Sequence, residues 1–242
     1  MRILIIRHAD PDYDIDGLTE RGKLEAAALA KKLLREDITE IYCSTLGRAR
    51  RTAEPTLEAK GMTAKYCEWL REFSYASVNL PYCDKPRICW DLLPSFVETC
   101  KGLYSPTEWR NEPFIREGDV LPHFDNVCRE LDKVIEKHGY VRDGYSYRAV
   151  KPNHDTIALF CHYGVASVLL AHLTNSSPYT FWQNTVKFPS SVTTIYTEER
   201  RDGIASMRAS GIGDVGHLYA EGLEPSFAAR FCECFADDAR HD

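Results

Sequence analysis

The chain has 242 residues, of which 44% are hydrophobic, and its formal net charge is −6 at pH 7. This length and composition suit one domain with a large core, or one domain with a substantial insertion. The negative charge argues against a surface built for nucleic acid or anionic membranes. The sequence also lacks an apolar run of about 18 residues that could cross a bilayer. We therefore expect neither a nucleic-acid partner nor a membrane partner.

The N-terminus and the cysteines predict a cytoplasmic protein. The start MRILIIRHAD has a short apolar run and no small-residue cleavage site after it, unlike a signal peptide. The nine cysteines mostly have apolar or aromatic neighbours, as Cys43 and Cys161 do. Without a secretion signal, we expect reduced thiols in the core. Cys232 and Cys234 come closest to a metal pair, but no second close pair completes a zinc pattern.

A short, fully buried strand is predicted at residues 3–6, Ile-Leu-Ile-Ile. The run stops at Arg7, His8 and Asp10, which cannot enter a dry core without partners. The strand should therefore carry them to the edge of a sheet where ligands bind in open α/β folds. A neutral histidine beside a fixed arginine is a nucleophile next to an anion site. The alternative interpretation is a solvated strand end.

A helix is predicted from Thr19, a suitable N-cap, to about Arg35, after an acidic loop at residues 11–17. A strand at residues 39–43 then leads into a second helix, which runs to about Lys60. The N-terminus of that helix offers free N–H groups to an anion. Its arginines at 48, 50 and 51 point in different directions, because a helix turns by about 100° per residue. We assign Arg50 and Arg51 to a solvated basic face.

Glu72 follows a predicted strand at residues 63–68 and has apolar and aromatic neighbours. Such a setting raises the pKa of a carboxyl group and makes it a proton donor near neutral pH. The alternative is a surface glutamate paired with Arg71.

Residues 74–118 fit neither a helical nor a strand pattern, apart from a short helix expected around residues 90–101. They hold five of the twelve prolines, together with interleaved aromatic and basic residues. Long irregular segments inside a domain are usually lids or binding loops, so we interpret this one as an inserted cap over the active site. The alternative is a partner-binding surface or the surface of a homodimer. The aromatic residues favour a ring-bearing leaving group, and the basic ones favour extra negative charge.

The C-terminal half contains a second buried strand that ends at a histidine, as the first strand does. An amphipathic helix at residues 119–137 and a polar loop at 140–153 precede a buried strand at 156–161. That strand ends at His162, and an apolar helix follows at residues 165–173. A hairpin is predicted from residues 192–197 and 204–208. The histidines at positions 8 and 162 converge if their two strands are neighbours.

Two further motifs are discounted. Residues 211–216 have the glycine spacing of a dinucleotide site, but no apolar helix and no second βαβ half follow them. Residues 234–240 have the Cys-x5-Arg spacing of a thiol phosphatase. Asp237 and Asp238 would lie in its phosphate cradle and repel the anion.

Taken together, the motifs resemble those of the histidine phosphatase superfamily, the phosphoglycerate-mutase-like group. Members carry Arg-His-Gly and Leu-Thr-x-x-Gly, here Arg7-His8-Ala9 and Leu18-Thr19-Glu20-Arg21-Gly22. Their Ser-x-Leu-x-Arg-Ala-x-x-Thr-Ala matches residues 44–53 at each position. Their Leu-x-Glu corresponds to residues 70–72, and their Ser-His-Gly-Gly to Cys161-His162-Tyr163-Gly164. The match covers residues 2–72 and 156–220 but not the cap.

The resemblance implies a three-layer α/β/α sandwich with a mostly parallel central sheet, in a single domain over residues 1–242 with the inserted cap at about 74–118. It implies that His8 attacks phosphorus and that Glu72 protonates the leaving oxygen. Arg7, Arg48 and His162 would hold the phosphoryl oxygens. Phosphoryl transfer asks mainly for positioning and positive charge, which two arginines and two imidazoles supply without a metal or another cofactor.

The expected function is therefore a metal-independent phosphomonoesterase that acts through a phosphohistidine on a small-molecule phosphate ester. The sequence departs from the family pattern at Ala9 and Tyr163, where glycine is usual. One alternative is a cofactor-dependent phosphoglycerate mutase-type phosphotransferase. The loop between Asp10 and Thr19 is short and acidic, however, and disfavours a second anionic group. The other alternative is a non-catalytic module that binds a phosphorylated ligand.

Overall fold

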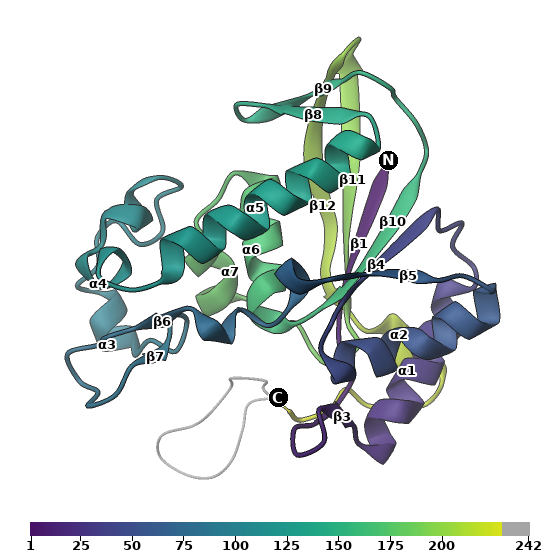
Figure 1. The fold of residues 1–242 in the computed structure, drawn as a ribbon, viewed down its shortest axis with the longest axis horizontal. Helices are drawn as coiled ribbons and strands as arrows, with labels where there is room; N and C mark the ends of the chain where they lie inside the picture. Colours follow the sequence, from purple (N-terminus) through teal and green to yellow (C-terminus); the bar gives the residue numbers. More distant parts are fainter. Residues whose placement is uncertain (229–242) are drawn as a thin grey trace.

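One central sheet of eight strands organises residues 1–228, the part of the chain that the computed structural model describes (Figure 1). The strands are β1 (Arg2–Arg7), β2 (Pro11–Asp12), β3 (Gly17–Leu18), β4 (Glu40–Ser44), β5 (Ala64–Cys67), β6 (Ser77–Val78), β7 (Arg87–Ile88), β8 (Tyr140–Asp143), β9 (Ser146–Ala149), β10 (Thr156–Cys161), β11 (Val192–Arg201) and β12 (Ile204–Asp214). The α-helices are α1 (Glu20–Leu33), α2 (Gly47–Lys60), α3 (Pro94–Val97), α4 (Pro113–Arg116), α5 (Val120–Lys137), α6 (Tyr163–Thr174), α7 (Pro178–Asn184) and α8 (Gly216–Ala220). Short 3-10 helices span Glu68–Leu70, Phe73–Tyr75 and Glu108–Asn111.

The sheet has the strand order β5-β4-β10-β1-β11-β12-β9-β8. The first four of these strands are parallel, and each later pairing is antiparallel. Six strands therefore run in one direction, whereas β11 and β9 run in the other, which confirms a mixed, mostly parallel sheet. Arg7 at the end of β1 pairs with Cys161 at the end of β10. This register brings the two segments that follow these strands to the same edge of the sheet.

Helices cover both faces of the sheet (Figure 1). Ile3 and Ile5 of β1 belong to the core formed with α5 and α6, whereas Leu4 and Ile6 belong to the core formed with α1 and α2. All four side chains are at most 3% exposed, because successive residues of a strand point to opposite faces. The unbroken apolar run predicted a strand buried on both sides, and this prediction is confirmed.

Local signals set the ends of the first two helices. The hydroxyl of Thr19 accepts a hydrogen bond from the N–H of Gly22, as expected of an N-cap, and α1 ends at Leu33. Gly61 ends α2 in the left-handed conformation with φ of 62°. The predicted junction at residues 44–47 is also confirmed, because β4 passes directly into α2 there.

The prediction of a polar loop at residues 140–153 is wrong. The segment contains the hairpin of β8 and β9, whose two-residue turn is Gly144 and Tyr145, with φ of 59° at Gly144. Glycine at the first position of a two-residue turn is a hairpin signal that the polar composition concealed. Tyr147 points into the core and is 1% exposed, whereas Tyr145 at the turn is 75% exposed.

The segment at residues 74–118 contains only short elements, and α3 is all that remains of the helix expected around residues 90–101. Three of its seven large aromatic residues, Trp90, Trp109 and Phe114, are buried in the core, whereas its three tyrosines are exposed. Trp109 is 1% exposed and packs edge-on against Phe124 of α5, and Phe114 packs against Tyr179 of α7. Trp90 lies between Tyr163 and Trp182 and is the part of this segment that borders the two strand ends described above.

The glycine motif and the cysteine motif that were discounted lie in different parts of the chain. Gly211 and Gly213 lie within β12 rather than in a turn that leads to a helix. Cys232, Cys234 and the 234–240 motif lie outside the described residues. Within residues 1–228, no helix is long and apolar enough to cross a membrane, and no group of three or more acidic, histidine or cysteine side chains is arranged to hold a metal ion.

Candidate active site

Two histidines meet at the carboxyl edge of the sheet. His8 follows β1 and His162 follows β10, and their ring centroids are 5.0 Å apart. The N–H of His8 donates to the carbonyl oxygen of Cys161 at 2.9 Å, so the backbone pairing of the two strands continues into the site. Both side chains are buried, with exposed fractions of 2% and 0%. The convergence predicted from the two strand ends is thus present.

The hydrogen bonding of His8 selects its tautomer. Its Nδ1 lies 2.8 Å from the carbonyl oxygen of Ala9, which can only accept a hydrogen bond. Nδ1 therefore carries the proton, and Nε2 keeps its lone pair. Burial, followed by the nearby charge of Arg7, lowers the pKa of His8 well below 6.5. His8 is consequently neutral with a free Nε2, the state that a nucleophile needs.

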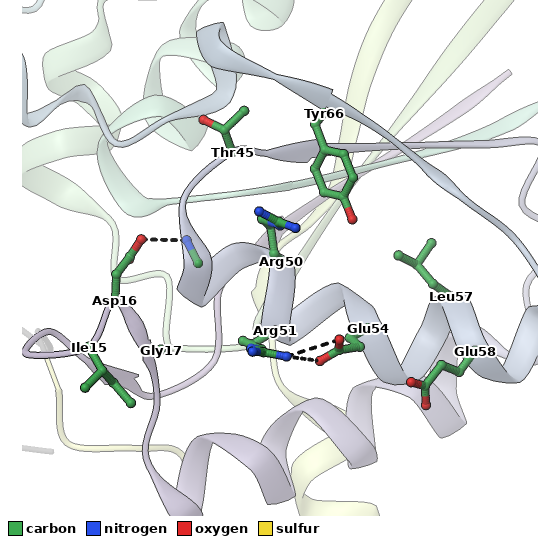
Figure 2. A pocket seen from close by; sticks show the side chains of 11 residues that line it. Ile15, Asp16, Gly17, Thr45, Arg50, Arg51, Glu54, Leu57, Glu58 and Tyr66 are labelled. Atoms are coloured by element: carbon green, nitrogen blue, oxygen red, sulfur yellow. Dashed lines mark hydrogen bonds and ion pairs between the residues drawn. The ribbon is translucent and has the colours of Figure 1, made fainter.

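Two arginines flank the histidines. Arg7 is 3% exposed, and its NH1 donates to the carbonyl oxygen of Lys187 at 2.5 Å. Arg48 comes from the first turn of α2, and its side chain is 12% exposed. Arg50 and Arg51 do not join them, because the first stacks on Tyr66 and the second pairs with Glu54 (Figure 2). The prediction of a solvated basic face for these two arginines is confirmed.

Several donors at this edge have no hydrogen-bond partner. Among the described residues, the buried side-chain nitrogens without one include Arg7 Nε, Arg48 Nε and His162 Nδ1. Ser44 Oγ accepts from the N–H of Leu46 and lies 2.8 Å from His162 Nε2. The Ser44 hydroxyl can donate its proton to Nε2, and in that tautomer the imidazole proton is on Nδ1. Buried donors are almost always paired, so these three favour a ligand with several acceptor oxygens.

Glu72 reaches the same edge from the turn after β5. Its Oε1 accepts from the N–H groups of Phe73 at 2.7 Å and Gly164 at 2.9 Å. Burial raises the pKa of Glu72, although Arg7 and Arg48 act in the opposite direction. Arg71 pairs with Glu68 instead, so the alternative of a surface pair between Arg71 and Glu72 is wrong.

Gly164 is required by this close approach. A Cβ atom at this position would lie 2.4 Å from the ring of Trp90 and 2.7 Å from Oε1 of Glu72. Both distances are well below van der Waals contact, so a side chain would displace the carboxyl group. The glycine of the sequence motif therefore brings Glu72 close to the two histidines.

The loop between β2 and β3 closes over Arg48. Asp16 accepts from NH1 of Arg48 at 2.7 Å and from the N–H of Gly47 at 2.6 Å, and the second bond is drawn in Figure 2. The ring of Tyr13 lies 5.4 Å from the guanidinium carbon of Arg48. These hydrogen bonds lower the pKa of Asp16, although partial burial opposes them. A carboxylate of the chain itself thus occupies donors suited to an anion.

Asp16 also borders a cavity. This pocket of about 670 Å³ runs along the outer face of α2, and Thr45, Arg50 and Tyr66 are among its lining residues (Figure 2). The sequence predicts only that the acidic loop repels a second anionic group of a substrate. The ion pair between Asp16 and Arg48 is not predicted from it. Tyr163 and Lys187, which contact Arg7, were not predicted as site residues either. No motif signals a contact between residues so far apart in the chain.

The first third of the chain matches a known protein family. Residues 3–80 match the model of the histidine phosphatase superfamily (branch 1). The matched segment contains four of the five predicted site residues, and His162 lies beyond it. This part of the chain is similar to the histidine phosphatase superfamily.

Similar proteins cover most of the length of this chain. A probable phosphatase from Schizosaccharomyces pombe is 27% identical over 236 residues, which is 91% of this chain and 97% of the relative. An adenosylcobalamin/alpha-ribazole phosphatase from Salmonella typhimurium is 23% identical, over 75% of this chain and 84% of the relative. Phosphoserine phosphatase from Entamoeba histolytica has the same fold, with a TM-score of 0.58 and 17% identity over 90% of this chain and 98% of that one. Each of these three proteins is named as a phosphatase.

Replacing Asp16 by asparagine should strengthen anion binding. The amide oxygen can still accept from Gly47, but the negative charge on Arg48 is gone, so we expect inorganic phosphate to bind about threefold to tenfold more tightly. Isothermal titration calorimetry measures this change. Asp14→Asn is the matched control, because Asp14 is exposed in the same loop, and it should change the affinity less than about twofold. Weaker binding by Asp16→Asn would mean that the carboxylate serves to hold Arg48 in place.

Proposed function

We propose that the protein is a metal-independent phosphomonoesterase that forms a phosphohistidine at His8 and acts on a small phosphorylated metabolite. The observation that carries this proposal is the state of His8, which is neutral and has its Nε2 free. Beside it lie three unpartnered donors, on Arg7, Arg48 and His162. A nucleophile among converging donors matches the demands of phosphoryl transfer, which are positioning and charge stabilisation.

In the first step, the lone pair of His8 Nε2 attacks phosphorus while the bond between phosphorus and the ester oxygen breaks. Arg7, Arg48 and the Nδ1–H of His162 hold the phosphoryl oxygens. The leaving oxygen takes a proton from Glu72, whose raised pKa favours the protonated form. The products of this step are a free alcohol, a phosphoryl group on His8 and an ionised Glu72.

In the second step, water attacks the phosphohistidine. Glu72 is now a carboxylate and accepts a proton from the water as the bond from phosphorus to nitrogen breaks. Inorganic phosphate leaves, and His8 returns to the neutral state with a free Nε2. The covalent intermediate thus divides one difficult displacement into two easier ones, and Glu72 acts first as an acid and then as a base.

The loop over Arg48 supports hydrolysis rather than transfer between two phosphorylated sugars or acids. A mutase must accommodate a second anionic group of its substrate. Here Asp16 directs a carboxylate at Arg48, and its charge opposes an additional anion at this position. We therefore favour a substrate with a single phosphate ester and propose a small molecule as its leaving group.

A cytoplasmic location is part of the proposal. The seven cysteines in residues 1–228 are all free, and five of them are buried. Reduced thiols are typical of proteins in a reducing compartment.

Hydrolysis of an aryl phosphate in the presence of EDTA tests the proposal. The wild-type enzyme should turn over, and His8→Ala should lose at least about three orders of magnitude in kcat, because no other group supplies the nucleophile. His154→Ala is the matched control, since His154 is exposed on a loop, and it should retain full activity. Wild-type protein that binds phosphate but does not hydrolyse the ester would instead favour a phospho-ligand binding module.

Glu72→Gln should reveal the proton donor through its dependence on the leaving group. An alkyl phosphate, whose alkoxide leaves poorly, should lose about 10²- to 10³-fold in kcat, whereas a nitrophenyl phosphate should lose less than about tenfold. Glu68→Gln changes an exposed glutamate of the same turn and should have no effect on either ester. Equal losses for both esters in Glu72→Gln would contradict a role in protonating the leaving oxygen.

A further inference from the structure

Lys187 is a buried cation next to the phosphate site. Its side chain lies between α7 and β11, and the residue is only 2% exposed. Nζ donates to the carbonyl oxygen of Phe181 at 3.2 Å and to the hydroxyl of Thr185 at 2.8 Å. It also lies 4.3 Å from the centroid of the Tyr163 ring. The two acceptors and the ring are electrically neutral, although a buried ammonium group normally needs a counter-charge.

The groups that face Lys187 come from each element around it. They are Arg7 at the end of β1, Glu72 before the second 3-10 helix, Cys161 at the end of β10 and the ring of Tyr163 in α6. Burial, followed by the charge of Arg7, lowers the pKa of Lys187 to about 7, and Glu72 opposes this shift. Burial raises the pKa of the Cys161 thiol and of the Tyr163 hydroxyl, so both stay neutral.

Two contacts couple Lys187 to Arg7. The carbonyl oxygen of Lys187 accepts the hydrogen bond from NH1 of Arg7. The ring of Tyr163 lies near both cations, with the guanidinium carbon of Arg7 5.6 Å from its centroid. The hydroxyl of Tyr163 donates to the carbonyl oxygen of Trp182, which fixes the ring in this position. Nζ therefore lies near the same aromatic ring as the guanidinium that is proposed to hold the phosphate.

We propose that Lys187 is a positioning residue that supplies a third positive charge to the phosphate site, and that its amine takes up a proton from water when a phosphate dianion binds. The inference rests on the proposed function, because it takes the anion to lie among Arg7, Arg48 and His162. Lys187 does not touch the ester. It acts through Arg7 and through the electric field across the Tyr163 ring.

The physical basis is the linkage between charge and proton binding. A dianion beside Arg7 offsets the repulsion between the guanidinium and Nζ, so it favours the ammonium form of Lys187. Linkage then requires the converse, that protonated Lys187 binds the dianion more tightly. Each unit by which the anion raises the pKa of Lys187 corresponds to about a tenfold difference in affinity between the two protonation states.

Tyr163 fits this assignment. It stands where the family pattern has glycine, and its ring lies close to both cations. The face of an aromatic ring stabilises a cation, and more strongly when water is excluded. Tyr163, a departure from the family pattern, thus occurs together with the buried Lys187 that it contacts.

Calorimetry with sulfate tests the proposal on the whole protein. Sulfate is a tetrahedral dianion that does not titrate near neutral pH, so any proton exchanged on binding belongs to the protein. Binding enthalpies at about pH 8, measured in two buffers of different ionisation enthalpy, should show uptake of roughly half a proton or more by the wild type. At about pH 5.5 the uptake should vanish, because Lys187 is already protonated there. Uptake by His8 or His162 would grow at low pH instead, since both have lowered pKa values.

Two variants assign the proton. Lys187→Met keeps the length of the side chain but not its charge, and it should abolish the uptake and weaken sulfate binding at about pH 6 by about tenfold. Lys187→Arg carries a permanent charge, so it should also abolish the uptake, but its affinity should not fall between about pH 6 and pH 8.5. Thermal unfolding shows whether each variant is folded, and the pH dependence of the wild type tests the proposal without either of them.

The outcomes separate this inference from the proposed function. Uptake that persists in Lys187→Met, or that increases toward low pH in the wild type, would overturn the role of Lys187. Hydrolysis that depends on His8, without any proton uptake at about pH 8, would overturn it while leaving the function intact. Uptake that depends on Lys187, in a protein that hydrolyses no ester, would support the cationic site and contradict the esterase.

Discussion

The parallel pairing of β1 with β10 is the constraint on which the site depends. Its register sets Arg7 opposite Cys161, so the next residue of each strand is a histidine, and the two rings lie 5.0 Å apart. Both strands are buried on two faces, which leaves no room for the histidines to move into solvent. Burial then keeps both imidazoles neutral by lowering their pKa values. The apolar packing of the sheet thereby determines the chemical state of the proposed nucleophile.

The charges of the site are arranged around an anion. Arg7 and Arg48 carry permanent positive charge, and Asp16 offsets that of Arg48 through a direct ion pair. Glu72 is held by backbone N–H groups, and burial raises the pKa of its carboxyl group. Lys187 adds a charge that depends on pH. A substrate dianion would thus compete with the carboxylate of Asp16 for Arg48, and it would favour the protonated form of Lys187. Its affinity would therefore depend on the loop that carries Asp16 and on pH.

Much of this arrangement was predictable from the sequence, because its signals are local. The apolar runs before His8 and His162, the cap at Thr19 and the Ser44–Ala53 motif each act within a few residues. The polar composition concealed the hairpin of β8 and β9, although Gly144 is a glycine at the first position of its two-residue turn. The ion pair of Asp16 and the contacts of Lys187 depend on loops that meet only in the folded chain. Lys187 lies 180 residues from Arg7 along the sequence, so no local pattern could reveal it.

The central claim, that His8 becomes phosphorylated, is tested most directly by trapping the intermediate. Enzyme mixed with an aryl phosphate is quenched in alkali within the first turnovers, and its peptides are examined by mass spectrometry. The account predicts one phosphoryl group on the peptide that contains His8, stable in base and lost in acid, as expected of a bond to nitrogen. A phosphoryl group on a serine or cysteine, or turnover with no phosphorylated peptide at any quench time, would contradict the account.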